Sequence, residues 1–439
     1  MASASRRVAL VLILAALVAL APAPAAAAPL AHREVLPNGI VLLVAERPAV
    51  PIVAVRVHLR AGAVLDPPGQ AGLANLTGAV LTRGTARRTA AQIDEAIEFV
   101  GGSLEAGASR DGLTASLAVV RRDLDLGLDL LAEVVLTPAF PAEEVARRAA
   151  RIQAAIKRSE EDPGTVASRA LGRLVFPQHP YGTPVEGTVE SVGRLTRDDV
   201  VGFYRQHARP DTTIVAVVGA ITVDEARQQV LRRFGGWTPP ASPPASIPMA
   251  AGTPAPSETR ITRDLTQATI MLGRQAIRQT DPDYFPLAVA SYILGGGSAS
   301  RLYGRVRDEG GLAYAVFSWV APGRHGASFT VSAQTRVREV PKVLDILRQE
   351  LARMGKEPVG EGELQLARQY LIGSFPLRLD TSAKVADFLV AIEAQGLGLD
   401  YADRYRAEVA KVTAADVQRV AATFFPPDTM SQVVVTAQP

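Results

Sequence analysis

Polar and apolar residues alternate in several short segments of this chain, as they do in β-strands that separate two environments. The period of two in residues 52–60 predicts a strand with one apolar face and one solvated polar face. The apolar face carries Val53, Val55, Val57 and Leu59, and the polar face carries Arg56, His58 and Arg60. Asn38-Gly39 within residues 35–44 and Asp111-Gly112 within residues 104–119 predict two hairpin turns.

Other segments have the helical period. Thr89 and Gln92 can form a capping box at the start of a helix, and Gly101-Gly102 can end it. The apolar side of this helix carries Ile93, Ile97 and Val100. Residues 123–135 and 141–160 predict two further helices.

The two halves of the chain end in the same pattern. Residues 195–220 and 412–437 align without a gap at a constant offset of 217 positions, so that Thr196 corresponds to Thr413. Each copy predicts a Thr-capped helix, a Pro-Asp turn and a β-rich run. Chance similarity is the alternative, but the constant offset favours a duplication. We therefore predict an α+β fold of two tandem homologous α/β sandwich domains, each a mixed, mostly antiparallel sheet covered by helices.

Composition suggests the domain boundaries. Residues 238–257 are rich in Pro, Ala and Ser and predict an extended linker between domains at residues 29–237 and 258–439. The chain has 439 residues, of which 48% are hydrophobic and 21% charged, which suits well-packed cores and excludes a disordered chain.

The first 28 residues have the pattern of a secretory signal peptide. Arg6-Arg7 precedes an apolar run at residues 8–20, and small residues follow up to Ala28. The apolar run is shorter than the ~20 residues that a spanning helix needs, although a short membrane anchor is an alternative. We predict a periplasmic protein that begins near Pro29 and has no stable membrane anchor.

Charge and cysteine content narrow the choice of partners. Residues 1–28 hold two basic residues and no acidic one, so the remainder carries 45 basic against 44 acidic residues. This near-neutral body gives no basis for nucleic-acid binding. The chain has no cysteine, so it has no disulfide and must rely on core packing.

Several segments together resemble the insulinase/pitrilysin/mitochondrial processing peptidase family. Residues 71–85 are similar to its metal-binding helix, whose pattern is GLAHxxEHxxxxGT. Three further segments resemble family motifs in family order: the HPYG stretch at residues 179–182, the glycine-rich region at residues 295–302 and the VRExxGLAY motif at residues 306–314. Each motif alone is weak, but together they span most of the chain.

The family's activity depends on the inverted zinc motif H-x-x-E-H, in which two His on one helix face bind Zn²⁺ and the Glu activates the bound water. The resemblance places Asn75 at the first His, Gly78 at the catalytic Glu and Ala79 at the second His. A third ligand, a Glu from a later helix, falls on Ala154-Ala155. Because Gly and Ala can neither bind zinc nor take a proton, we expect no metal and no cofactor in this chain, and no catalytic residue in the chain alone.

The histidines suggest no alternative metal site. They are His32, His58, His179, His207 and His325, and no two lie within four residues of each other. We expect His58 to be solvated on the polar face of its strand and His179 to be structural.

The resemblance implies a different contribution for two residues of the second half. Some bacterial members of the family work as two-chain enzymes, in which the chain without zinc supplies an Arg and a Tyr that face the zinc and bind the substrate. Arg307 and Tyr314 match this pair. A guanidinium can hold a peptide carbonyl, and a phenol can donate a second hydrogen bond. Outside the motif, an Arg on a helix and a Tyr in a strand would be ordinary surface and core residues.

The resemblance also implies substrate contacts elsewhere. Gly295, Gly296 and Gly297 would form a flexible loop beside the substrate chamber, although a plain turn at the entry to a helix is the alternative. In the family, an edge strand near the metal helix pairs with the peptide backbone, and the resemblance implies this role for the hairpin at residues 104–119. An ordinary surface hairpin is equally compatible with the sequence.

Three functional hypotheses remain. The first is a subunit that is inactive alone but required in a heterodimeric zinc metallopeptidase, with zinc in the partner chain and peptides as substrates. The second is a peptide-binding or scaffold protein with no role in hydrolysis. The third is an autonomous peptidase, which the loss of the zinc ligands disfavours.

Overall fold

The computed structural model describes residues 30–250 and 252–438, so the predicted signal peptide lies outside the described residues. The first half contains the following elements in chain order: β1 (His32–Val35), β2 (Val41–Glu46), β3 (Ile52–Leu59), α2 (Leu73–Val80), α3 (Ala90–Phe99), β4 (Ser103–Ala108), β5 (Leu113–Val120), α4 (Leu124–Leu136), α5 (Ala142–Ser159), α6 (Pro163–Val175), α7 (Val189–Arg194), α8 (Arg197–His207), β6 (Thr213–Gly219) and α9 (Val223–Phe234). The second half contains β7 (Glu258–Thr262), β8 (Gln267–Ala276), α10 (Tyr284–Gly295), β9 (Ala313–Pro322), β10 (Ala327–Arg336), α11 (Val340–Lys356), α12 (Glu361–Ser374), α13 (Ser382–Gln395), α14 (Tyr401–Lys411), α15 (Ala414–Phe424) and β11 (Ser431–Thr436).

Each half forms its own mixed sheet, and the two sheets have the same topology. The first has the order β1-β2-β6-β3-β5-β4 and the second the order β7-β11-β8-β10-β9. Apart from the additional β1, the strands correspond one to one. The pair β2–β6 is parallel like its counterpart β7–β11, and the neighbouring pairs β3–β6 and β8–β11 are both antiparallel. The predicted fold class is confirmed, and the strand order supports the duplication.

Local sequence signals explain most element boundaries. Thr89 caps α3 through a capping box with Gln92, and Thr196 and Thr413 form equivalent capping boxes at α8 and α15. The hairpin of β1 and β2 turns at Gly39, whose φ of +92° favours glycine. The predicted hairpin at residues 104–119 is present as β4 and β5. Residues 238–250 and 252–257 contain no helix or strand, as an extended linker would.

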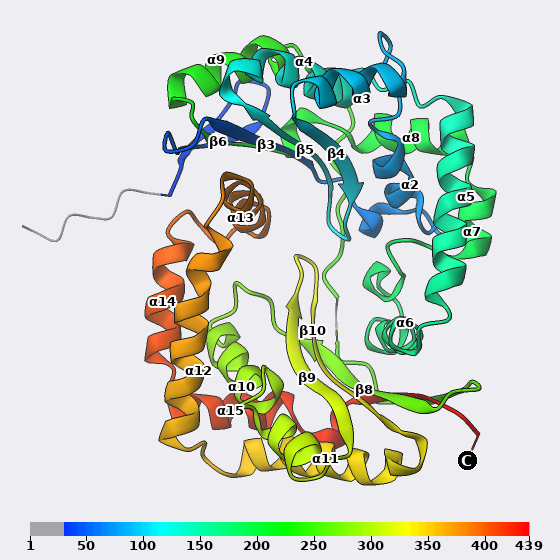
Figure 1. Cartoon of the computed structure of the whole chain (residues 1–439), viewed down its shortest axis with the longest axis vertical. Coiled ribbons are helices and arrows are strands. Elements are labelled where there is room, and N and C mark those ends of the chain that lie inside the picture. The colour runs from blue at the N-terminus through cyan, green and yellow to red at the C-terminus, as the bar shows by residue number, and fades with distance from the viewer. Residues whose placement is uncertain (1–29, 251, 439) are drawn as a thin grey trace, which may run out of the picture. The chain divides into compact units, whose positions relative to one another are not determined.

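Two equivalent helices exchange places between the halves. Helix α6 belongs to the first half but packs on β8 and β11 of the second sheet, where Ala167, Leu171 and Val175 share a core with Met271 and Val433. Helix α13 belongs to the second half but packs on β3 and β6 of the first sheet. Figure 1 shows α13 against the first sheet and α6 beside the second. Each sheet is therefore covered in part by a helix from the other half.

This exchange corrects the prediction for the polar face of β3. We expected a solvated face, but Arg56 and His58 are buried, with exposed fractions of 8% and 7%. The cause is α13, whose Asp387 accepts hydrogen bonds from Arg56 at 2.6 and 3.3 Å. A pattern of alternating residues shows which side chains share a face of a strand, but it does not show what covers that face.

Candidate functional site

Helix α2 carries the positions that correspond to the family's zinc motif. It starts without a Ser or Thr cap: the carboxylate of Asp66 accepts hydrogen bonds from the backbone N–H groups of Gly72 and Ala74, both at 2.8 Å. Burial raises the pKa of Asp66 to about 6, against the lowering effect of these backbone donors. The helix start is therefore held by a partly buried carboxyl group six residues before the cap position, Gly72.

The position of the family's catalytic Glu is closed by backbone packing. Gly78 is buried, and a Cβ atom at this residue would lie 2.8 Å from the backbone nitrogen of Ala108 and 2.8 Å from the carbonyl carbon of Gly107. Both atoms belong to the edge strand β4, which packs directly on α2. The space that a Glu side chain would need is occupied by this strand.

The remaining motif positions supply no ligand either. Asn75 and Ala79 are partly exposed on α2, and Ala154 and Ala155 are exposed on α5. Their neighbour Gln153 donates a hydrogen bond to the carbonyl of Val189 and is engaged in packing. Within residues 30–250 and 252–438 no group of three or more His, Asp or Glu side chains is placed to hold a metal ion. The residues at this site do not fit the zinc of the family.

The structure brings Arg307 and Tyr314 together, as the motif suggested. Arg307 lies on a π-helical segment, Tyr303–Asp308, and its guanidinium carbon lies 5.4 Å from the centre of the Tyr314 ring. Leu302 and Val306 point into the core and orient this segment, so that Arg307 is exposed. Tyr314 lies near the start of the edge strand β9, with 79% of its surface exposed.

A third residue completes this arrangement. The ring of Tyr303 lies 4.7 Å from the guanidinium carbon of Arg307, on which both tyrosines therefore converge. In the part of the chain that the structure describes, the Arg307 guanidinium forms no ion pair or hydrogen bond besides these ring contacts. Sequence reasoning missed Tyr303, although its position four residues before Arg307 places it on the same side of a helical turn. We call these three residues the Arg–Tyr cluster.

The glycine-rich segment has a structural explanation at two of its positions, since a Cβ atom at Gly296 would lie 2.6 Å from the Cα atom of Tyr292. Gly295 is the last residue of α10 and is buried; a Cβ atom there would lie 2.5 Å from the backbone nitrogen of Ser318 in β9. Gly296 and Gly297 follow at the end of the helix and reach the surface to different extents. Close packing of α10 on β9 accounts for Gly295, and only the other two glycines are accessible to a ligand.

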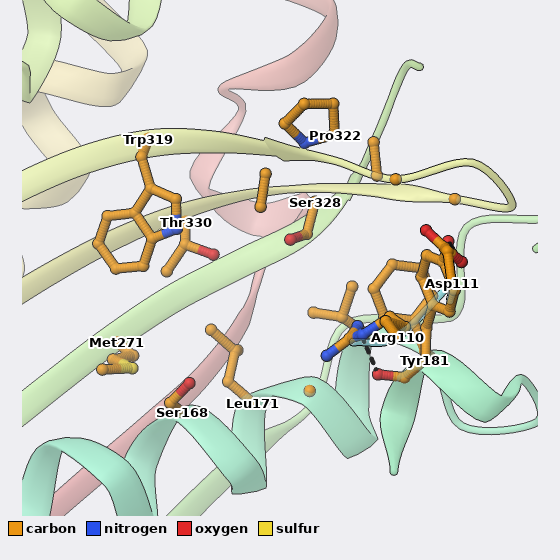
Figure 2. Close-up of a pocket in the computed structure, with 17 residues that line it drawn as sticks. Arg110, Asp111, Ser168, Leu171, Tyr181, Met271, Trp319, Pro322, Ser328 and Thr330 are labelled. Atoms are coloured by element: carbon orange, nitrogen blue, oxygen red, sulfur yellow. Dashed lines mark hydrogen bonds between the residues drawn. The ribbon is translucent and has the colours of Figure 1, made fainter. Parts of the chain in front are cut away.

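A pocket that the sequence did not predict lies between α6, β8–β10 and the β4–β5 turn (Figure 2). It encloses about 320 Å³ and has an apolar side formed by Leu171, Met271 and Trp319. At its other end, Arg110 donates to the carbonyl of Tyr181 at 2.9 Å. We call it the central pocket.

Tyr181 of the HPYG stretch connects the two halves beside this pocket. Its hydroxyl donates to Asp111 at 2.6 Å and accepts from the backbone N–H of His325 at 3.0 Å. His179 accepts a hydrogen bond from the backbone N–H of Tyr181 at 3.2 Å, which supports the structural role we expected for it. The family-like stretch thus holds the turns of the β4–β5 and β9–β10 hairpins together.

Comparison with known proteins agrees with the fold and the motifs. Residues 41–189 match the profile of the insulinase family (peptidase family M16), and residues 194–371 match that of the peptidase M16 inactive domain. An uncharacterized zinc protease of Streptomyces coelicolor is 29% identical over 396 residues, which cover 89% of this chain and 86% of that protein. One of Rickettsia bellii is 25% identical over 408 residues, which cover 91% of this chain and 96% of that protein.

Solved structures show the same relationship. The peptidase M16 inactive domain from Pseudomonas fluorescens has a TM-score of 0.88 and 26% identity, over 93% of this chain and 98% of that one. A protease from Helicobacter pylori has a TM-score of 0.85 at 19% identity, over 93% and 99% of the two chains, and shares the fold. The chain belongs to the insulinase family of peptidases. Within that family it is a member without the H-x-x-E-H motif.

Proposed function

We propose that this chain is the non-catalytic subunit of a periplasmic two-chain zinc metallopeptidase, in which a zinc-bearing family member is the partner. In this proposal the chain binds peptide substrates and contributes the Arg–Tyr cluster to the shared site. The observation that carries it is the exposed guanidinium of Arg307, which converges with Tyr303 and Tyr314 and has no ionic partner within the described residues.

The chemistry of the cluster suits contact with a substrate in the course of peptide hydrolysis. A guanidinium presents several fixed donors, which can hold a peptide carbonyl and stabilise the negative charge that develops on its oxygen. The two aromatic rings restrict the movement of the guanidinium and do not neutralise its positive charge. Since Gly78 offers neither a proton acceptor nor space for one, the attacking water would have to be activated by the partner chain.

Reconstitution tests this proposal. The purified chain is mixed with a zinc-bearing family member from the same organism, and cleavage of a peptide library is measured for each protein alone and for the mixture. We expect cleavage in the mixture only, and a fall of about 10²-fold in kcat for Arg307→Ala, the size observed when one donor to a developing oxyanion is lost. Arg338→Ala is the matched control, because Arg338 is an exposed arginine of the same half.

Two results would contradict the proposal. Cleavage by the partner that does not depend on this chain would favour a peptide-binding or scaffold function. Stoichiometric zinc in the isolated chain, together with cleavage that chelators abolish, would identify an autonomous peptidase.

A further inference from the structure

The duplication places a second pocket at the position equivalent to the central pocket. The central pocket lies between α6 and the second sheet, beside the β4–β5 turn. The second pocket lies between α13 and strands β3 and β5 of the first sheet, beside the β9–β10 turn, and encloses about 270 Å³. This volume is far above the ~10–15 Å³ that one water molecule requires.

The two equivalent pockets differ in chemistry. Where the central pocket has Leu171, Met271 and Trp319, the second pocket has Arg60, Arg324 and His58. Arg60 follows β3, and Arg324 lies in the turn between β9 and β10. We call the second pocket the cationic pocket.

Arg60 has no ion-pair partner within the described residues. Its Nε atom is buried without a hydrogen-bond partner. Arg56, on the same face of β3, shows the contrast: its guanidinium donates two hydrogen bonds to Asp387 of α13. The α13 side of the pocket is otherwise lined by Val390, Ala391, Ala394 and Gln395, none of which carries a charge that could pair with Arg60.

The nearby carboxylates are engaged elsewhere. Asp111 accepts hydrogen bonds from the Tyr181 hydroxyl at 2.6 Å and from the backbone N–H of Arg324 at 3.3 Å. Glu393 accepts two hydrogen bonds from Arg33. One nitrogen of the Arg324 side chain donates a hydrogen bond to the carbonyl of Ala394. This carbonyl is uncharged and does not balance the charge of the guanidinium.

Electrostatics agree with an excess of positive charge in the pocket. Burial, and then the charge of Arg324, lower the pKa of Arg60, against the raising effect of the Glu393 carboxylate. Burial, followed by the charge of Arg60, lowers the pKa of His58 to about 4, so this ring is neutral at pH 7. Its Nδ1 lies 2.9 Å from the Thr114 hydroxyl, and its other nitrogen is on the side of the ring near Gly112. The lining holds two guanidinium groups, a neutral His and a hydroxyl, while its carboxylates Asp111 and Asp387 already accept hydrogen bonds from other groups. The two guanidinium groups therefore favour an anion.

We propose that the cationic pocket binds a small oxyanion, a carboxylate or phosphate group, between the guanidinium groups of Arg60 and Arg324. Guanidinium groups match both oxyanions through paired N–H donors, and a bound anion would give Arg60 and Arg324 the ionic partner that neither has within the described residues. The proposal concerns residues outside the Arg–Tyr cluster and does not depend on the proposed peptidase partnership.

Calorimetric titration of the full chain with inorganic phosphate, at constant ionic strength maintained with sodium chloride, tests the site. We expect saturable binding that weakens by at least about tenfold in Arg60→Gln and in Arg324→Gln, since each variant loses a charge-assisted hydrogen bond. Arg338→Gln, at a distant exposed arginine, should bind as the wild type does. Parallel titrations with acetate, and with a short peptide bearing a free or an amidated C-terminus, distinguish a carboxylate ligand from phosphate.

A second measurement avoids dependence on variants that fold poorly. The His58 ring faces the charges of Arg60 and Arg324 on one hand and those of Asp111 and Asp387 on the other. A bound anion offsets the two positive charges, so we expect it to move the NMR titration of His58 in the wild-type chain to higher pH. Absence of saturable binding by every probe, or equal affinity in the wild type and both arginine variants, would overturn the proposal.

Discussion

At the scale of single residues, His58 couples protonation to folding. Its pKa is about 4 in the folded chain, against 6.5 for the exposed side chain, because burial and two arginines disfavour the charged form. Between these pKa values the unfolded chain binds the proton and the folded chain does not. Protonation of His58 therefore leaves the free energy of unfolding unchanged above about pH 6.5 and lowers it as the pH decreases to about 4. This shift in the pKa of His58 corresponds to a loss of up to about 3 kcal/mol in the free energy of unfolding.

Urea unfolding at pH 7 and pH 4.5 measures this effect. We expect His58→Gln to lose less stability over this interval than the wild type, whereas His32→Gln, at a side chain that is 48% exposed, should follow the wild type. Asp66 acts in the opposite direction, since its raised pKa of about 6 adds stability as the pH falls below that value. The comparison between variants is therefore decisive: equal losses in wild type and His58→Gln would show that His58 is not responsible.

At the scale of elements, the close contact between α2 and β4 favours glycine at position 78 of this chain. This position corresponds to the catalytic Glu of the family. Alanine favours a helix interior over glycine by about 1 kcal/mol, so Gly78→Ala would stabilise an unconstrained helix. Here the new Cβ atom would lie 2.8 Å from the backbone of β4, and we expect a net loss of about 1–3 kcal/mol in the free energy of unfolding. Gly107→Ala on β4 is the control, because its Cβ atom would have no neighbour within 4 Å. A more stable Gly78→Ala variant would mean that α2 and β4 can separate.

Local signals predicted elements well but did not predict which sheet a helix covers. The capping boxes at Thr89, Thr196 and Thr413 marked the starts of helices because side chain and backbone interact within four residues. The motif resemblance also placed Arg307 close to Tyr314. Nothing in the pattern of α13 shows that it packs on the opposite half, and for that reason we predicted a solvated His58. Both pockets were missed because they depend on contacts between segments distant in sequence, whereas Tyr303 could have been found from its spacing of four residues from Arg307.

At the scale of the whole molecule, the exchange of α6 and α13 makes each half dependent on the other. If residues 29–237 and 258–439 are produced separately, each sheet lacks the helix that buries part of one of its faces. We expect each fragment alone to bind a hydrophobic dye and to unfold without a cooperative transition, whereas the two produced together should associate and unfold as one unit. The control for the separate fragments is the intact chain after cleavage within residues 238–257, which contain no described helix or strand. The two halves of the cleaved chain should elute together in size-exclusion chromatography. If either isolated fragment unfolded cooperatively, its sheet would be stable without the helix from the other half. The exchanged helices would then contribute little to the stability of that half.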